Sequence, residues 1–434
     1  MGTKKIAVLV SAIALGLCVG FWWLSSRSDV GSKIVINGIL THTVETRVPS
    51  PNAFDYYLKS TQMLVDQGMI DNASRIVDYA RRHPSEIVPP DTLTAMCDVV
   101  SKNRNALDEF RKGFPYEYQG PEIKSVDQMC PYYKGYREIA RLLAVSAYIQ
   151  AHDDKPATAI NYLLDNMELG SDVPRGGGAL ARLVGVACQA IGRAPAWNII
   201  DVLNAKETIA ALKRVQKIRE NTLPIYQTME QERNSLIYIL QQSLYPKPGI
   251  KPSIADMSKM SDFQKRRILS RVSNHYDELI EYTKKPYVTM VKAPSELKPT
   301  MNPFTFRADA IASVYSEILE PDANKLVLKY TIGESFNALF EATLALHAYK
   351  LQYGKYPDNL NQLAKYCKTP VKDPFVGNDS LRYKKTVNSY LLYSVGPDGV
   401  DNGGQPIMNT NQNQKSLKIE ATSKGDIVAG VMKM

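Results

Sequence analysis

The stretch FNALFEATLALHAYKLQYGKYP, residues 336–357, decides the fold of the C-terminal part of the chain. Its apolar side chains recur every three or four residues, which is the spacing of one face of an amphipathic helix. That face consists of Phe336, Leu339, Phe340, Leu344, Ala348 and Leu351, whereas Asn337, Glu341 and Lys350 lie largely away from it. Gly354 and Pro357 are the usual signals that end a helix, so the pattern predicts a helix that stops near residue 354.

Two short runs that favour β-strands follow this helix. LRYKK (381–385) and SYLLYSVG (389–396) are rich in aromatic and branched side chains, and Asn388-Ser389 fits the turn of a hairpin. One helix packed on a small antiparallel sheet forms a stable two-layer unit. We therefore expect a C-terminal α+β domain that folds on its own apolar face.

The loop from Gly396 to Gln405 is acidic and rich in glycine. Asp398, Asp401 and Asn402 carry hard oxygen atoms within five residues of one another. Calcium binds about six to eight such oxygens from flexible donors, so these three residues are a candidate calcium site. The spacing lacks the Glu that ends an EF-hand loop. A solvated loop in which Asp398 caps a turn beside Gly399 explains the same residues.

This order of elements resembles the globular domain of the major pseudopilin of type II secretion systems. In that family a spine helix leads through a Tyr-Pro exit and an Asp-Pro turn to a small antiparallel sheet and a calcium-binding acidic loop. Tyr356-Pro357 and Asp373-Pro374 stand at the matching places here. The resemblance implies a pseudopilin-like fold for residues 326–434 and calcium bound in the loop. The chain departs from the family after the loop, where QPIMNTNQNQ replaces a further acidic pair.

The segment IAVLVSAIALGLCVGFWWL (6–24) is a run of nineteen uncharged, mainly apolar residues. A helix of that length measures about 28 Å, which is enough to cross the apolar core of a bilayer. Lys4 and Lys5 place the N-terminus in the cytoplasm, and Trp22 and Trp23 fit the opposite interface. We expect a single uncleaved transmembrane anchor in the cytoplasmic membrane, with the rest of the chain periplasmic or otherwise extracytoplasmic. A cleaved signal peptide is the alternative.

The N-terminus also separates the chain from true pseudopilins. Those proteins carry a short leader, a Gly-Phe processing site and a glutamate five residues into a membrane helix that continues into the spine. The chain has none of these features, and about three hundred residues lie between the apolar run and the predicted spine helix. We therefore do not expect it to assemble into a filament.

The region between the anchor and the C-terminal domain has the apolar spacing of helices almost throughout. Neighbouring segments are joined by short polar or glycine-rich turns, which predicts antiparallel helical hairpins. The thirty-four-residue signature of tetratricopeptide repeats is not legible. The expected helices cover residues 52–68, 72–83, 136–154, 155–170, 177–193, 206–222 and 223–244.

These patterns predict a mainly α-helical protein with one small C-terminal α+β domain and one N-terminal transmembrane helix. A basic amphipathic helix is expected within residues 261–285, where its Lys and Arg side chains could touch a membrane surface or face water. The expected parts are a cytoplasmic stub with the anchor (1–30), a helical hairpin domain (31–245), a Pro- and Lys-rich connector (246–325) and the pseudopilin-like domain (326–434).

No catalytic or zinc-binding motif is visible in the sequence. The five histidines show no paired spacing, and HExxH, GxSxG, Walker and dinucleotide-binding patterns are missing. Arg175-Gly-Gly-Gly178 could receive an anion at the start of the following helix, although a plain helix-to-helix connector explains the glycine run better. Four cysteines outside the anchor allow three pairings, and free buried thiols are the alternative. We expect Cys97 to pair with Cys130, leaving Cys188 and Cys367.

Two classes of function remain open. The net charge of +9 is spread along the chain and suggests only loose affinity for anionic envelope polymers or lipids, and nucleic acid is not expected outside the cytoplasm. The first class is a non-enzymatic envelope scaffold that presents the pseudopilin-like domain to an envelope or secretion-system protein. The second is an envelope hydrolase with a dispersed active site among the helices. An inward-facing cluster of Asp, Glu or His would favour the second class.

Overall fold

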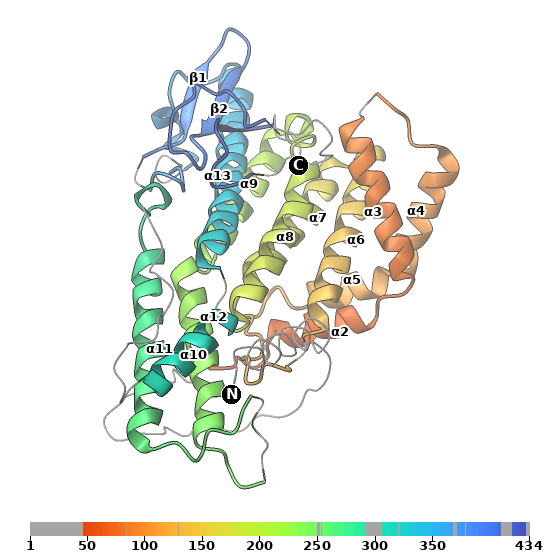
Figure 1. The fold of residues 1–434 in the computed structure, drawn as a ribbon. Helices are drawn as coiled ribbons and strands as arrows, with labels where there is room; N and C mark the ends of the chain where they lie inside the picture. The colour runs from red at the N-terminus through yellow and green to blue at the C-terminus, as the bar shows by residue number, and fades with distance from the viewer. Residues whose placement is uncertain are drawn as a thin grey trace.

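The computed structural model describes residues 47–430 except 84, 129, 250–251, 253, 291–305, 320–321, 368–370, 378 and 409–418. Within these residues the chain forms twelve α-helices and a three-stranded antiparallel sheet, which confirms the expected, mainly helical class (Figure 1). The expected anchor, residues 6–24, lies outside them. None of the helices in the described part has the length and hydrophobicity that crossing a bilayer requires.

The first four helices lie at one side of the molecule (Figure 1). The expected helix 52–68 is shorter in the structure, where it ends at Gln62. Asp66, directly before the next helix, adopts a left-handed backbone conformation with φ 53°. The two helices between residues 90 and 111 were not expected, since their short apolar pattern gave no clear period. The bounds are α2 (Ala53–Gln62), α3 (Gln67–Arg82), α4 (Pro90–Lys102) and α5 (Arg104–Arg111).

Three long antiparallel helices form the centre and confirm the predicted hairpins (Figure 1). The second and third approach so closely that a Cβ atom added at Gly170 would lie 2.4 Å from the carbonyl oxygen of Gly185. Only glycine permits this crossing without a shift of the backbone. The helices are α6 (Tyr132–His152), α7 (Pro156–Asp172) and α8 (Gly178–Ala196).

Four further helices follow, and two of them start with a capping box. Asn204 with Glu207, and Ser261 with Gln264, form capping boxes at the first residues of α9 and α11. The basic helix α11 packs on α12, where Arg267 Nε lies 2.8 Å from Asp309 Oδ1. Part of its basic face is therefore paired within the protein. The bounds are α9 (Ala205–Glu220), α10 (Ile225–Leu244), α11 (Asp262–Thr283) and α12 (Phe306–Leu319).

The C-terminal helix α13 (Ala323–Tyr353) leads into the sheet, which lies at its far end (Figure 1). Gly354 ends the helix in the left-handed conformation, with φ 71°, as its sequence predicts. The predicted hairpin is also confirmed, with Thr386 N donating to Ser389 O in its turn. The sheet order is β1-β2-β3, with β1 (Arg382–Lys385), β2 (Tyr390–Ser394) and β3 (Ile427–Val428).

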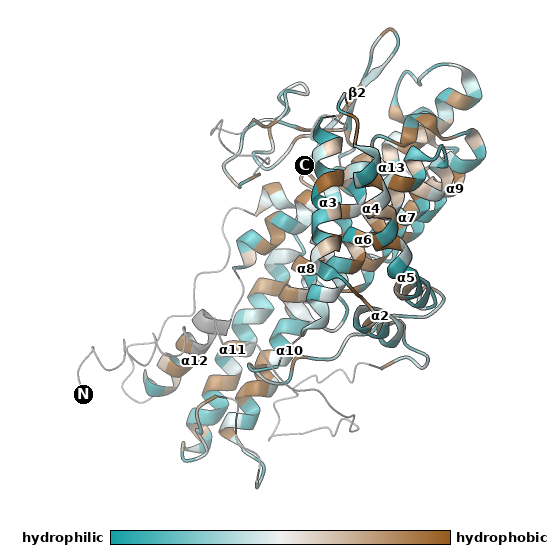
Figure 2. Cartoon of the chain, turned by 90° about the vertical axis from the view of Figure 1, so that its right-hand side faces the viewer, coloured by the Kyte–Doolittle hydropathy of each residue, from teal (hydrophilic) through white to brown (hydrophobic). Residues whose placement is uncertain are grey.

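The sheet, α13 and the central helices share one hydrophobic core. Leu163 of α7 and Val215 of α9 belong to the same buried cluster as Phe340 of α13 and Leu392 of β2. Each residue of α13 from Ser335 to Ala348 is buried, so the single apolar face that the sequence indicates is only part of its contact surface. The helices carry polar and apolar residues side by side, as helices that bury one side do (Figure 2).

The polar side of α13 faces the helical body rather than water. Asn337 Oδ1 accepts a hydrogen bond of 2.6 Å from Arg193 Nη1, and Glu341 pairs with Arg219 of α9. His347 Nε2 lies 3.0 Å from the carbonyl oxygen of Leu203. Burying these groups costs little because each has a partner. The C-terminal module, defined as α13 and the sheet, is therefore joined to the body on two sides.

Candidate functional site

The residues predicted to bind calcium lie together in the loop after β2. Asp398 Oδ1 accepts a hydrogen bond of 3.1 Å from Val400 N, which is the turn cap that the sequence offered as the alternative. Asn402 Nδ2 lies 2.9 Å from Val400 O and 3.5 Å from Asp398 Oδ2. The structure thus brings Asp398 and Asn402 together, but through bonds that stabilise the turn itself.

Asp401 is held by the neighbouring strands and by its own loop. Its Oδ1 accepts hydrogen bonds of 2.8 Å from the Tyr393 hydroxyl and 2.9 Å from Gly403 N, and Arg382 Nε lies 3.5 Å from Oδ2. The bond from Gly403, followed by that from Tyr393, lowers the pKa of Asp401. Its carboxylate is therefore ionised at neutral pH.

A third acidic residue, Asp426, completes this group and was missed by the sequence analysis. It is fully buried, and it accepts hydrogen bonds of 3.3 Å from Asn402 N and 2.7 Å from Gly404 N. Burial raises its pKa, and the charges of Asp401 and Asp398 add to that effect. No local spacing could have found it, because pairing of β3 with β2 brings it to the loop.

These acidic side chains do not form a ready metal site. In the part of the chain that the structure describes, no group of three or more His, Cys, Asp and Glu side chains is arranged to hold a metal ion. Each carboxylate of the loop turns toward backbone amides, Tyr393 or Arg382. The present arrangement therefore does not fit a calcium ion, and binding would require Asp398 and Asp401 to leave these partners. Calcium binding by the loop stays a prediction.

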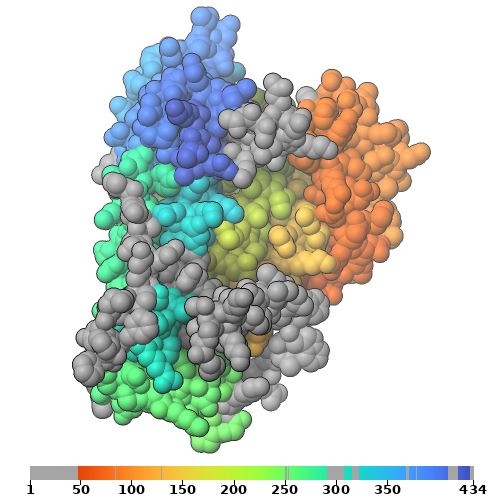
Figure 3. Space-filling view, viewed as in Figure 1, coloured from red at the N-terminus to blue at the C-terminus, as the bar shows by residue number. Residues whose placement is uncertain are grey.

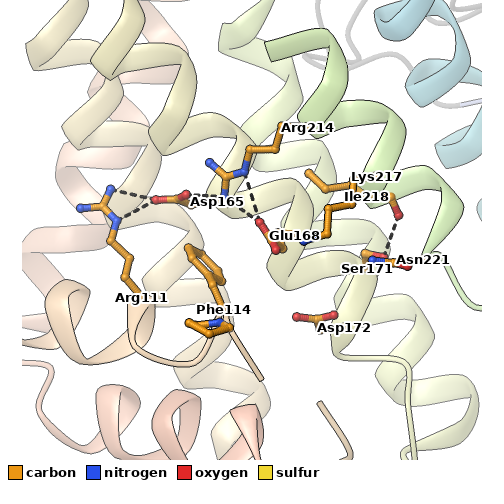
Figure 4. A pocket seen from close by; sticks show the side chains of 11 residues that line it. Arg111, Phe114, Asp165, Glu168, Ser171, Asp172, Arg214, Lys217, Ile218 and Asn221 are labelled. Carbon is orange, nitrogen blue, oxygen red and sulfur yellow. Dashed lines mark hydrogen bonds and ion pairs between the residues drawn. The ribbon is translucent and has the colours of Figure 1, made fainter. Parts of the chain in front are cut away.

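A cavity of about 510 Å3 opens between α5, α7 and α9 (Figure 4). Asp165, Glu168 and Asp172 line it from α7, at positions i, i+3 and i+7, which lie on one side of a helix. Arg214 and Lys217 line it from α9. The remaining lining residues are Arg111, Phe114, Pro115, Ser171, Ile218 and Asn221.

Ion pairs between different helices fix the shape of this cavity. Asp165, whose side chain is 4% exposed, lies 2.8 Å from Arg111 Nε and 2.6 Å from Arg214 Nη2. Arg214 also lies 2.7 Å from Glu168 Oε2, and its guanidinium stacks over the Phe114 ring at 5.4 Å. A carboxylate shared between two guanidinium groups ties α5, α7 and α9 together.

Asp172 has a different environment from its two neighbours. Its Oδ2 accepts a hydrogen bond of 2.9 Å from the buried Tyr57 hydroxyl, and its Oδ1 lies 3.3 Å from Arg175 Nη1. Burial raises the pKa of Asp172 to about 7, although Arg175 and Tyr57 oppose the shift. The cavity therefore contains one carboxyl that titrates near neutral pH beside the ion-paired Glu168.

The glycine run before α8 has no room for an outside anion in this arrangement. Gly178 N donates a hydrogen bond of 3.2 Å to Gln231 Oε1, and Ala179 N donates to Glu232 Oε1. A carboxylate of the protein itself therefore occupies the helix N-terminus. Burial raises the pKa of Glu232 to about 7, and the bond from Ala179 opposes this shift. The plain-connector interpretation of Arg175–Gly178 fits this geometry better than the anion site.

The predicted pairing of Cys97 with Cys130 is wrong in this structure, where both are free thiols. Cys97 is exposed on α4, whereas Cys130 is half-buried beside the Tyr132 hydroxyl at 3.2 Å. Cys188 and Cys367 are free and buried, and burial raises the pKa of each to about 12. Such thiols are poor nucleophiles and poor metal ligands at neutral pH.

The sequence offered no catalytic residues for the structure to bring together, and the carboxylates of the cavity gave no motif. Their partners Arg111 and Arg214 lie 54 and 49 residues from Asp165, too far apart for any local pattern. Comparison with known proteins adds no assignment: no protein family model, no curated protein and no solved structure matches the chain.

Proposed function

We propose that the chain is a non-enzymatic envelope protein, anchored in the cytoplasmic membrane by residues 6–24, whose helical body presents the C-terminal module to a partner protein. The burial of α13 on every side from Ser335 to Ala348 carries this proposal. A spine helix that its own chain covers has no free face for packing into a filament. The module is therefore left with its sheet and loops as the surface for contact.

The exposed end of the module is well placed for a partner. Val387, at the hairpin tip, is 95% exposed, and Val400, in the acidic loop, is 55% exposed. In Figure 3 the C-terminal residues, drawn in blue, form one end of the molecule. Single exposed valines are common on protein surfaces and prove nothing alone. They do provide two positions at which a probe can be introduced without disturbing the core.

Site-specific crosslinking in the source cells tests this proposal. A photoreactive side chain is placed at Val387 or Val400, and a matched control is placed at Ile87, which is 90% exposed in the loop between α3 and α4, outside the module. Discrete adducts are expected at the two module positions and not at Ile87. Adducts of equal pattern at all three positions, or at Ile87 alone, would contradict the proposal.

The cavity favours an envelope hydrolase as the second candidate. Glu168 is paired with Arg214, whereas burial raises the pKa of Asp172 to about 7, so that about half of its carboxyl groups carry a proton at pH 7. Two carboxyls in such different environments can divide the roles of base and acid. Hydrolysis of cell-wall fragments that both Glu168→Gln and Asp172→Asn abolish would establish this candidate. Full crosslinking at Val387 with no such hydrolysis would leave the presenting role as the function.

A further inference from the structure

We propose that the cavity between α5, α7 and α9 is a binding site for a neutral, polyhydroxylated small molecule of the size of a short saccharide. Its volume of about 510 Å3 lies within the range of about 300–1,000 Å3 that small-molecule sites have. The Arg111–Asp165–Arg214 contacts hold its walls in place before any ligand arrives. Such preorganisation lowers the cost of binding.

The charges of the lining decide against a charged ligand. Arg111, Arg214 and Lys217 carry three positive charges, and Asp165, Glu168 and Asp172 can carry three negative charges. An anion near Lys217 would be repelled by the carboxylates of α7. A cation near those carboxylates would be repelled by the guanidinium groups of Arg111 and Arg214. Neither sign of net charge is favoured, so an uncharged ligand fits this lining best.

The arrangement of donors and acceptors favours hydroxyl groups. A hydroxyl both donates and accepts a hydrogen bond, so it is satisfied where a cation and a carboxylate lie side by side. Lys217, exposed on α9, forms no ion pair among the residues the structure describes, and it lies close enough to Asp172 to lower that residue's pKa. Lys217 can donate to a ligand and Asp172 can accept from it.

The cavity also has an apolar side. Figure 4 shows Phe114 beside Glu168 and Asp172, and Pro115 and Ile218 also line the cavity. The ring of a sugar has apolar C–H groups on its faces and hydroxyls around its edge, which matches an aromatic side chain next to polar groups.

Calorimetric titration of the full-length protein in detergent tests this proposal. The probes are two uncharged trisaccharides, tri-N-acetylchitotriose and maltotriose, with citrate and spermidine as charged comparisons. We expect one of the trisaccharides to bind with a dissociation constant of about 1 mM or tighter. Saturable binding of citrate or spermidine in preference to both sugars would overturn the proposal. Failure of both sugars to bind would overturn it as well.

Variants then locate the bound sugar. Lys217→Ala should weaken binding about tenfold, because a hydrogen bond from a charged donor is lost. Asp172→Asn should weaken it less, since an acceptor oxygen remains. The matched control is Lys206→Ala, which changes an exposed lysine of the same helix that does not line the cavity. Equal affinity in the Lys217 and Lys206 variants, with unchanged thermal unfolding, would also overturn the site.

Discussion

The protein contains two groups of acidic residues that are stabilised in different ways. On α7, Asp165 and Glu168 are paired with arginines of other helices and Asp172 accepts a hydrogen bond from Tyr57 of α2, whereas the carboxylates of the C-terminal loop accept hydrogen bonds mainly from backbone amides of the same loop. The first group depends on the tertiary fold and the second on local turn geometry. The groups are the α7 cluster (Asp165, Glu168 and Asp172) and the loop cluster (Asp398, Asp401 and Asp426).

The difference bears on what each cluster can do. In the α7 cluster, removing Asp165 leaves the half-buried Arg111 without its carboxylate and Arg214 with Glu168 alone, so the walls of the cavity depend on Asp165. In the loop cluster, most of the amides that lose an acceptor can turn to water. Asp426 is the exception because it is fully buried. The comparison therefore predicts the order of the stability losses that substitutions in the two clusters cause. A different measured order would contradict it.

The largest loss is expected for Asp165→Asn, at about 3 kcal/mol, because both Arg111 and Arg214 lose their shared partner. Urea unfolding followed by circular dichroism measures it. Asp108→Ala is the matched control, because Asp108 is exposed on α5 and its ion pair with Arg104 Nε is long at 3.9 Å. The loss of stability in this variant should stay below about 0.5 kcal/mol. Equal losses in the two variants would remove the distinction between the clusters.

The next loss is expected for Asp426→Ala, at about 1–3 kcal/mol, because two half-buried amides lose the buried carboxylate that accepts their hydrogen bonds. Hydrogen exchange should show faster exchange at Asn402 and Gly404 while the amides of α7 keep their protection. If exchange instead rises equally throughout the molecule, Asp426 supports the whole core rather than the loop.

A smaller effect concerns pH. The pKa of Asp172 is raised in the folded state to about 7 from an ordinary value of 3.8, so the folded state binds its proton more tightly. Its contribution to stability is full below about pH 4 and is lost as the pH rises through 7. Asp172→Asn should therefore flatten the fall in stability between pH 4 and 7. Glu232, raised in the same way, should keep the remaining slope.

If the fall in stability from pH 4 to 7 is as steep in Asp172→Asn as in the unaltered protein, Asp172 is ionised throughout that range. The acid role that the hydrolase candidate assigns to it would then be excluded.

The smallest effect is expected for Asp398→Ala in the presence of a chelator, at about 0.5 kcal/mol, since one turn hydrogen bond is lost.

Thermal melting with added calcium tests the predicted calcium site of the same loop. If the loop binds the ion, calcium raises the melting temperature, and Asp398→Ala and Asp401→Ala each remove most of that rise, whereas Asn402→Ala removes less. Identical melting with calcium and with chelator would exclude the calcium site.

Sequence patterns predicted those parts of the fold that local chemistry controls. Gly354 ends α13, and the hairpin turn at Asn388-Ser389 and the central helical pairs appear where their signals stand. The signals are local because caps, turns and apolar periodicity act over four or five residues. Asp398 as a turn cap belongs to the same class.

Features that depend on contacts between distant segments could not be predicted. Asn337 and Glu341 looked like a solvent-facing side of α13, but Arg193 and Arg219 cover them. Asp426 reaches the loop only through strand pairing, and the cavity exists only because α5 and α9 meet on α7. One sequence contains no information on which arginine pairs with which carboxylate across fifty residues.

The central claim is that the C-terminal module and the helical body share one core. The most direct test is to express residues 322–430 alone and with residues 47–290 as a separate chain. The account predicts that the isolated module lacks a cooperative thermal transition, because the side of α13 that meets α8 and α9 is uncovered, and that the second chain restores one. A sharp cooperative transition in the isolated module, unchanged by the second chain, would contradict the account.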